Sequence, residues 1–558
     1  MGRHFSLSAL FLAFCVLSSG LAAATKPNLI LITLDSGRAD RMGFLGSHHG
    51  LTPNLDAVAK ESVIFERAYT QAPLTVESVA TILTGTYPQT HHANSLSVPL
   101  AVGLPYFPDL LHGSGYHTAA FVGSVLLDPQ NGPFQAYGRG FDTYDAGFVE
   151  GKSLRPGIQV VERADKWLTG QNRSPFFLWI HLQDADISRV SYDREIRMAD
   201  AAVGKLVSTL RAQKLYDDSL IVVAADHGQA LGDHGEETHG LFLYDETVRV
   251  PLLMKLPQNK SAGKRVANRA RLLDVAPAIL EIAGVPTPSQ MQGQSLLRIA
   301  QGSSQTEQPS YARTDLPQQG FACGSVESWR AGKFLYVRAP KPELYDLATD
   351  PGATHNLEQT SKATLETLAS QLQSFDTRIA KEGGTASPGL TSSQVQLLAS
   401  LGYVGVAKNT AGVQTGTTGT DPKDIVAIAN KTLMAMALVE SGQSARAVLA
   451  FRPIISERAD TYLAQYGLGA ALVREQKYSD AIPYLHKAIE LQPESAWAQY
   501  EMGLCLVKTG QFKTAALHLE IAENHLPAFS PLHSALADAY SHLGRKDNAA
   551  RERKLAEQ

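Results

Sequence analysis

Residues 219–251 read SLIVVAADHGQALGDHGEETHGLFLYDETVRVP, and the fold argument starts from them. An apolar run rich in β-branched residues, Leu220–Ala225, leads directly into Asp226 and His227. A further imidazole, His239, follows in the Gly-rich segment. A buried strand that ends in an acid and an imidazole places two metal-competent side chains at the edge of a sheet. Open α/β folds bind metals and substrates at this edge.

Three other β-rich runs, Asn28–Leu34, His117–Val122 and Phe176–Leu182, alternate with helical patterns in the first half of the chain. This alternation predicts an α/β fold, with a mostly parallel central sheet flanked by helices. Asp35 follows the first run and Asp184 follows the third. A single acid after a strand is usually a turn residue or a helix cap. Acids after three of the four strands instead predict one shared site.

The next part of the chain has a different pattern. Residues 321–347 contain short β-rich pieces, which predict a small antiparallel subdomain, and Lys362–Ile379 has the pattern of an amphipathic helix. Gly405–Thr420 is rich in Gly and Thr, which is typical of a flexible linker. Its length predicts that the domain after it is loosely tethered.

Beyond Asp421 the pattern is helical and repeats with a period of 34 residues. The small residues would let paired helices approach closely, and the prolines would end the second helix. This part resembles the tetratricopeptide repeat, an α-solenoid that either binds a protein or peptide partner or serves as a scaffold. Five positions recur in the two best copies: Tyr466 and Tyr500, Gly469 and Gly503, Tyr478 and Phe512, Ala481 and Ala515, Pro493 and Pro527.

The composition is that of an ordinary globular protein. The 558 residues are 44% hydrophobic and 19% charged, and the net charge of −4 gives no reason to expect a nucleic-acid partner. Residues 1–24 have the pattern of a secretory signal, whose apolar stretch is too short to span a bilayer. We therefore expect an exported, periplasmic or secreted protein without a transmembrane segment in the mature chain. Only Cys323 and Cys505 remain after the signal, so the fold does not depend on disulfides.

The candidate nucleophile is Thr75, which begins a probable helix over Val76–Leu83. One interpretation is structural, because a threonine at this position commonly caps the helix. The other is catalytic. The N-terminus of a helix stabilises an anionic group, and a hydroxyl bound to a divalent cation becomes a usable nucleophile. Glu77 and Ser78 follow Thr75 and have no assigned role.

Several other polar residues favour structural roles. His48-His49 and His91-His92 lie in polar segments and are expected to be solvated. His181 alternates with Trp179 on a strand, which favours a hydrogen-bonded core histidine over the alternative of a role beside Asp184. Two further expectations are an Arg38–Asp40 ion pair and a structural role for Asp233-His234.

Residues 26–380 resemble the sulfatase family of the alkaline-phosphatase superfamily. The matching pieces occur in the order typical of the family, and the ordered set is far more specific than any one piece. They are NLILITLDSGRAD (Asn28–Asp40), TPNLDAVAKESVIF (Thr52–Phe65), LTGTYP (Leu83–Pro88), DHG (Asp226–Gly228), HGLFLYDETVRVP (His239–Pro251), Glu343–Leu347 and Asn356-Leu357.

The resemblance implies an alkaline-phosphatase-like fold and assigns roles to individual residues. It implies a divalent metal ion (Ca, Mg, Mn or Zn) held by Asp35, Thr75, Asp226 and His227, with Thr75 at the nucleophile position. A second metal or the anion of the substrate would be bound by a second group of residues, namely His239, Asp184 and Asp186.

The chain also departs from the family pattern. A sulfatase normally carries Cys or Ser in C/S-x-P-x-R and oxidises it to formylglycine, whereas this segment is Thr75-Val-Glu-Ser-Val79. Formylglycine is therefore not expected. Ser36 replaces the second acid of the usual Asp-Asp pair, and Gln229 stands where Glu is common.

These features predict an exported, metal-dependent hydrolase that cleaves small anionic sulfate or phosphate esters through a threonine nucleophile. The alternative is a catalytically degenerate sulfatase-like protein that acts by binding through its repeat domain. The expected organisation is a signal peptide (1–24), a hydrolase domain (25–380), a helix and linker (381–423) and a repeat domain (424–558).

Overall fold

The computed structural model describes most of the chain between residues 26 and 557. The predicted signal segment, Asp186 and most of the Gly/Thr-rich segment lie outside the described residues. The described ranges are 26–93, 100–101, 103–130, 132–147, 155–170, 175–184, 191–302, 307–382 and 418–557.

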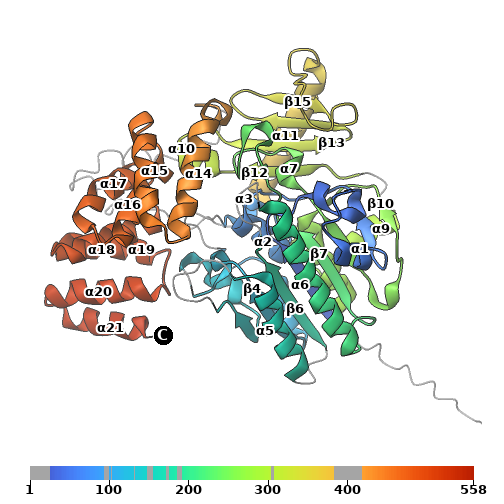
Figure 1. Ribbon diagram of the computed structural model, residues 1–558, viewed down its shortest axis with the longest axis horizontal. Helices are drawn as coiled ribbons and strands as arrows, with labels where there is room; N and C mark the ends of the chain where they lie inside the picture. The colour runs from blue at the N-terminus through green and yellow to red at the C-terminus, as the bar shows by residue number, and fades with distance from the viewer. Residues whose placement is uncertain are drawn as a thin grey trace, which may run out of the picture.

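An eight-stranded sheet forms the centre of the first half of the chain, in the order β10-β2-β9-β7-β1-β6-β4-β5 (Figure 1). Strands β7, β1, β6, β4 and β5 are mutually parallel, while β9 runs antiparallel to β7 and β2. The predicted mostly parallel α/β fold is confirmed. The strands are β1 (Leu29–Leu34), β2 (Val63–Phe65), β4 (His117–Val122), β5 (Thr143–Asp145), β6 (Phe176–Leu182), β7 (Leu220–Ala225), β9 (Leu252–Lys255) and β10 (Arg265–Val266).

The register of the central strands aligns the ends that carry the acids. Leu34 of β1 pairs with Leu182 of β6 on one side and with Ala225 of β7 on the other. The ladder continues past the strands, because the Asp35 N–H donates to the Leu182 carbonyl and the Asp226 N–H donates to the Leu34 carbonyl. Asp35 and Asp226 therefore lie side by side at the carboxyl edge of the sheet.

Helices cover both faces of the sheet, as the alternating pattern predicts. On one face α6 (Tyr192–Ala212) packs against α1 (Pro53–Ala59) and α5 (Gly157–Gly170). On the other face α2 (Thr75–Thr84) and α4 (Phe107–Gly113) pack against α8 (Val275–Ala283). Every residue of α2 is buried, so the helix that starts at Thr75 lies wholly inside the molecule.

Two smaller sheets complete this half. One is formed by β3 (Ala68–Tyr69), β8 (Arg249–Val250) and β11 (Ala270–Arg271). The other is the predicted antiparallel subdomain, whose strands lie in chain order and pack against α11 (Lys362–Glu382). Its strands are β12 (Ser310–Thr314), β13 (Val326–Ala331), β14 (Phe334–Arg338) and β15 (Glu343–Asp346).

The last part of the described chain is an array of paired helices, stacked beside the α/β half in Figure 1. The close approach predicted at the recurring glycines is present, because a Cβ on Gly469 or Gly503 would lie about 2.6 or 2.5 Å from the leucine of the paired helix. The helices are α14 (Val426–Glu440), α15 (Ser444–Glu457), α16 (Tyr462–Arg474), α17 (Tyr478–Leu491), α18 (Ala496–Lys508), α19 (Phe512–Glu523), α20 (Ser530–His542) and α21 (Lys546–Ala556).

The expectation of a loose tether is wrong for the described residues, because the repeat helices share a hydrophobic core with the antiparallel subdomain. Leu463 of α16 packs on Gly320 of α10 (Leu316–Phe321), where an added Cβ would lie 2.6 Å from it. The Arg458 guanidinium also donates to the Phe321 carbonyl at 3.0 Å. The Gly/Thr-rich composition of a linker does not show whether the two domains that it connects pack against each other.

No helix among the described residues is both long enough and apolar enough to cross a membrane.

Candidate functional site

Three of the predicted metal ligands converge at the carboxyl edge of the central sheet. One ligand atom from each of Asp35, Asp226 and His227 lies within 4.8 Å of the other two. All three side chains are buried, Asp226 and His227 completely. Two carboxylates and one imidazole form a hard oxygen and nitrogen set that suits a divalent cation.

Asp226 shows that this group fits a cation. Its Oδ1 accepts hydrogen bonds from the backbone N–H groups of Ser36 (3.1 Å) and His227 (2.7 Å). Its Oδ2 is buried and accepts no hydrogen bond from any described residue. A buried carboxylate oxygen without a donor is costly, and a bound cation would remove that cost.

The ring of His227 is oriented for the same role. Its Nδ1 lies 2.9 Å from the Gly228 carbonyl oxygen, so Nδ1 carries the proton and donates it there. The lone pair of Nε2 then points toward the two carboxylates, 3.7 Å from Asp226 Oδ2 and 4.0 Å from Asp35 Oδ1. A fixed tautomer of this kind is what a metal-binding histidine needs.

Thr75 is the fourth member of the group. Its Oγ1 lies 3.2 Å from His227 Nε2 and 3.3 Å from Asp35 Oδ2. The N-cap of α2 is Leu74, Thr75 is the first helical residue, and no side chain caps the helix. The structural interpretation of Thr75 as a helix cap is therefore wrong, and its hydroxyl faces the candidate metal ligands. Ser78, one turn later, donates to the Asp226 carbonyl at 2.6 Å, which is a structural contact.

The charges at the site are strongly coupled. Burial alone would raise the pKa of Asp35, but the contact with His181 and the charge that His227 carries when it is protonated outweigh it and hold this pKa well below its usual value. Burial together with the charge of Asp35 raises the pKa of Asp226 to about 6. Burial alone would lower the pKa of His227, yet the two carboxylates raise it. Two buried acids in contact thus attract a proton, or a cation in its place.

His181 belongs to the surroundings of Asp35, which the sequence did not indicate. Its Nε2 lies 3.5 Å from Asp35 Oδ2, and its Nδ1 lies 2.9 Å from the Thr33 hydroxyl. Trp179 Nε1 donates to the same hydroxyl at 3.0 Å. The predicted hydrogen-bonded core position is present. The far side of the ring, however, faces the candidate ligand, which only the pairing of β1 with β6 reveals.

His239 lies beside the group without joining it. Its ring centroid is 4.3 Å from that of His227, and its Nδ1 lies 2.6 Å from the side-chain oxygen of Gln229. Burial, with the nearby charge of His227, lowers the pKa of His239 to about 3, so the ring is neutral. Gln229, which replaces a common Glu, therefore orients His239.

Ser36 stands where the family pattern has its second acid. Its φ of 55° lies in the left-handed region, which is uncommon for a residue other than glycine. In this conformation its N–H donates to Asp226, and its hydroxyl donates to Asp35 Oδ1 at 2.8 Å. The serine thus holds both acids in place instead of supplying a third carboxylate.

Asp184 lies near the site but outside the three-ligand group. It lines a small cavity together with Asp35, and its Oδ1 accepts the Gly157 N–H at 2.8 Å. Burial raises its pKa, and its Oδ2 accepts no hydrogen bond from the described residues. Asp186 lies outside the described residues. A second metal at these residues stays a prediction.

The expectation that His91 is solvated is wrong. His91 is fully buried, its Nε2 lies 3.0 Å from the Thr81 hydroxyl, and burial lowers its pKa to about 3. The polar residues around it in sequence belong to α3 (Pro88–His91), which packs against α2.

A second group with metal-ligand spacing lies in the repeat domain and consists of Glu523, His533 and Glu552. Both ring nitrogens of His533 already have partners, because Nδ1 lies 2.7 Å from Glu552 and Nε2 lies 2.9 Å from a backbone carbonyl. The same pattern occurs one repeat earlier, where Gln499 contacts His518 and a backbone carbonyl. This group is therefore part of a recurring buried hydrogen-bond network.

Comparison with known families and proteins gives the same two parts. The family described as Sulfatase matches residues 27–285, and the C-terminal family of N-sulphoglucosamine sulphohydrolase matches residues 232–378. Tetratricopeptide repeat families match residues 432–496 and 472–539.

Individual relatives resemble the first part of the chain. An ulvan-active sulfatase of Formosa agariphila is 24% identical over 62% of this chain and 80% of its own length. A Δ4,5-hexuronate-2-O-sulfatase of Bacteroides thetaiotaomicron is 23% identical over 63% of this chain and 88% of its own. The crystal structure of a phosphonate monoester hydrolase of Agrobacterium radiobacter superposes with a TM-score of 0.52 at 17% identity, over 63% of this chain and 96% of its own.

Proposed function

Because this chain belongs to the sulfatase family and continues into tetratricopeptide repeats, we propose that it is a metal-dependent hydrolase of sulfate or phosphate esters whose nucleophile is Thr75. One observation carries the proposal: the Thr75 hydroxyl, at the start of a buried helix, lies within 3.3 Å of both Asp35 and His227. A structural threonine at a helix start would bond its own backbone instead.

Asp35, Asp226 and His227 would hold the divalent metal, with Thr75 at its side. The uncovered Oδ2 of Asp226 and the fixed tautomer of His227 support this set. A bound divalent cation would neutralise the anionic ester group and lower the pKa of the threonine hydroxyl. The N-terminus of α2 adds the partial positive charge of its free N–H groups on the same side.

The reaction then needs a path for one proton. The hydroxyl of Thr75 lies 3.3 Å from Asp35 Oδ2, and this carboxylate would accept its proton as Oγ1 attacks phosphorus or sulfur, because Nε2 of His227 would be used by the metal. The new Oγ1 bond forms while the bond to the ester oxygen breaks, and the leaving alkoxide takes up the proton that Asp35 accepted. Water then cleaves the threonine ester and restores the hydroxyl. The neutral His239 lies next to His227, in a position to contact the anion.

The relatives bear on the substrate class. Two of them are described as sulfatases of ulvan and of an unsaturated hexuronate, and one as a phosphonate monoester hydrolase. A threonine cannot be oxidised to the aldehyde of formylglycine, so turnover here would go through an alkoxide. We therefore propose a phosphate, phosphonate or sulfate monoester as substrate, with formylglycine absent.

An ester panel tests the class of reaction. Purified full-length protein is assayed with an aryl sulfate, an aryl phosphate and an aryl phosphonate, after EDTA treatment and after addition of Ca, Mg, Mn or Zn. The proposal predicts turnover of at least one ester that EDTA abolishes and one metal restores. Turnover that is unchanged by EDTA would refute metal dependence.

The alternative is a protein that has lost turnover and binds through its repeats. The observation in its favour is Ser36, which replaces an acid of the usual pair. No turnover of any ester, together with no metal in the purified protein, would establish this alternative. In either case we propose that the repeat domain takes a protein or peptide partner, as solenoids of this kind commonly do.

We also propose that the protein is exported. The support is the sequence of residues 1–24, with a basic start, an apolar stretch and a small-residue end. N-terminal sequencing of protein recovered from the periplasm or the medium should find the chain beginning near Thr25. Recovery of the intact N-terminus in the cytosol would contradict export.

A further inference from the structure

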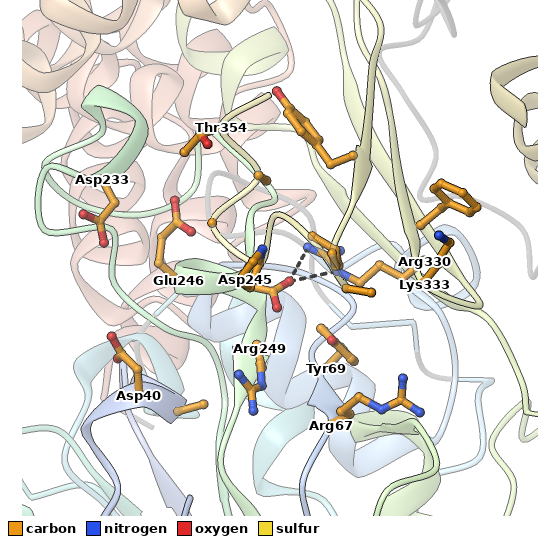
Figure 2. A pocket seen from close by; sticks show the side chains of 18 of the residues that line it. Asp40, Arg67, Tyr69, Asp233, Asp245, Glu246, Arg249, Arg330, Lys333 and Thr354 are labelled. Atoms are coloured by element: carbon orange, nitrogen blue, oxygen red, sulfur yellow. Dashed lines mark hydrogen bonds and ion pairs between the residues drawn. The ribbon is translucent and has the colours of Figure 1, made fainter. Parts of the chain in front are cut away.

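A large cavity among the described residues lies away from the candidate metal ligands. Its volume is about 1010 Å³, and none of Asp35, Thr75, Asp226, His227 and His239 lines it. It opens between the end of the central sheet, the β3–β8–β11 sheet and the antiparallel subdomain (Figure 2). A cavity of this size is sufficient for a ligand larger than a single ion.

A continuous stretch of backbone separates the cavity from the metal ligands. The Gly228 N–H donates to the Thr247 carbonyl at 2.8 Å, and the Gln229 N–H donates to the Glu246 carbonyl at 3.0 Å. Glu246 belongs to α7 (Asp245–Val248), which lines the cavity on its other side. A ligand in the cavity would therefore not contact His227 or the other candidate metal ligands.

One wall of the cavity is basic and consists of Arg67, Arg249 and Arg269. Figure 2 shows Arg67 below Tyr69 and Arg249 to the left of it. Arg67 and Arg269 share a single carboxylate, that of Glu307. Burial, together with the positive charges of Arg67 and Arg330, lowers the pKa of Arg269 even though Glu307 is beside it. The wall therefore has more positive than negative charge.

Arg249 is the cation with the fewest partners. Its Nη2 donates to the Glu66 carbonyl oxygen at 3.0 Å, while its Nε is buried without a hydrogen bond. Within the described part of the chain, no carboxylate lies within ion-pair distance of its guanidinium. A buried guanidinium edge without an acceptor is costly, and an anionic oxygen would satisfy it.

The acids that line the cavity have cationic partners. Asp40 and Asp233 both pair with Arg38, which confirms the predicted ion pair and the structural role of Asp233. Glu246 pairs with His234 at 2.5 Å. These carboxylates are half exposed at Asp40 and Asp233, so they retain lone pairs for hydroxyl donors.

Part of the lining is apolar and includes Phe334, Leu347 and Pro351. The other two cations that line the cavity, Arg330 and Lys333, are paired with Asp245 and Asp346. The cavity thus combines a basic wall, hydroxyl-accepting carboxylates and an apolar floor. A carbohydrate with an anionic substituent has the matching parts: an anion, hydroxyl donors and apolar ring faces. We propose that this cavity is a second binding site, which takes an anionic saccharide with its charged group on Arg249.

Titration calorimetry on the full-length protein tests the site. The protein carries Thr75→Val and is kept in EDTA, so that esters stay intact and the metal site is empty. The ligands are the sulfate ester of glucose, its phosphate ester, glucuronate and glucose itself. We expect at least one anionic sugar to bind and glucose not to bind. The sugar with the highest affinity identifies the preferred anion as sulfate, phosphate or carboxylate.

Variants locate the binding. Arg249→Met should weaken it by about tenfold or more, because a charge-assisted hydrogen bond is lost. Arg265→Met is the matched control, since Arg265 is a nearby exposed arginine that does not line the cavity. If Arg249→Met fails to fold, Arg67→Met at the exposed rim should show a smaller loss.

Three results would overturn the proposal. They are no binding of any anionic sugar at millimolar concentration, equal affinity in the folded arginine variants and their parent, and loss of binding in Asp226→Asn. The last would place the anion at the metal ligands instead. None of these results depends on turnover, so the site can fail while the proposed hydrolase activity stands.

Discussion

The two oxygens of Asp226 have different surroundings, and this difference leads to a prediction about metal binding. Oδ1 accepts two backbone hydrogen bonds, whereas Oδ2 accepts none from the described residues. Asp226→Asn keeps the shape and removes the charge, so the metal content of the purified protein should fall from about one ion per chain to nearly none. Asp193→Asn, a surface acid paired with Arg41, is the matched control. Elemental analysis that finds equal metal in Asp226→Asn and wild type would contradict the ligand assignment.

His181 should act on the metal through Asp35. Its Nε2 faces Asp35 Oδ2, and Thr33 holds the other ring nitrogen. Removal of a residue that orients a metal ligand typically weakens metal affinity by ~10–100-fold. We expect a loss of that order in His181→Ala, measured by competition with a chelator. His181→Gln, whose amide can occupy the place of Nε2, should recover part of the affinity, and equal weakening in both variants would argue for a purely structural role.

At the residue scale, the sequence was sufficient to predict those candidate metal ligands that directly follow a strand. Asp35 and Asp226 could be predicted because acids at the ends of neighbouring parallel strands must lie together. The contact of His181 with Asp35 could not be predicted, because the alternation of residues along a strand shows which face of the sheet a side chain is on but not which residue it contacts. Gln229 and Ser36 could not either, since their roles depend on loop conformations, including a positive φ at Ser36.

At the element scale, the loop after β7 is held by one buried acid. The Glu236 carboxylate accepts the N–H groups of Leu241 (2.7 Å) and Phe242 (3.2 Å), so it fixes the segment that carries His239. Burial raises the pKa of Glu236 to about 8, and the two hydrogen bonds oppose this shift only in part.

The raised pKa of Glu236 predicts a pH-dependent stability. The unfolded chain releases this proton near pH 4.5, whereas the folded protein keeps it to about pH 8. The contribution of Glu236 to the free energy of unfolding should therefore be greatest below pH 4.5 and fall as pH rises toward 8. Between pH 5 and 8 the melting temperature of wild type should fall by several degrees relative to Glu236→Gln. The control is Glu237→Gln at the exposed neighbouring residue, whose melting temperature should change with pH as that of wild type does. The same dependence of melting temperature on pH in all three proteins would refute the pKa assignment.

The elements themselves were well predicted from the sequence. The runs His117–Val122, Phe176–Leu182 and Leu220–Ala225 are the strands β4, β6 and β7 with the same bounds. Long apolar runs in a parallel sheet are buried on both faces, so their signal is strong. The predicted helix Val76–Leu83 starts one residue earlier, at Thr75, because Leu74 takes the N-cap position that the threonine was expected to fill.

At the scale of the whole molecule, the repeat domain and the hydrolase half support each other. Asn430 of α14 donates to the Gly235 carbonyl (2.7 Å) and accepts the Glu237 N–H (3.0 Å). These contacts hold the same loop that Glu236 fixes from within. The sequence could not predict this docking, because apolar residues such as Leu463 and Leu316 fit equally well into the core of their own domain.

The shared core predicts that the two parts unfold together. Leu463→Ala leaves a cavity at the contact with Gly320 and should lower the free energy of unfolding by about 2–5 kcal/mol. We also expect it to split a single calorimetric transition into two. Leu449→Ala is the matched control, because Leu449 is 72% exposed on α15 and should cost little. Two separate transitions already present in the wild-type protein would show that the parts are independent.

The most direct test of the central claim is a search for the covalent intermediate on Thr75. Full-length protein with metal is mixed with the ester it turns over, quenched in acid within one turnover and analysed by peptide mass spectrometry. The proposed mechanism predicts one phosphoryl or sulfuryl group on the peptide that contains Thr75, present in the Thr81→Ala control and absent together with turnover in Thr75→Ala. Thr81 lies in the same helix but contacts His91 instead of the metal ligands. Undiminished turnover by Thr75→Ala, or the adduct on another residue, would contradict the assignment of Thr75 as the nucleophile.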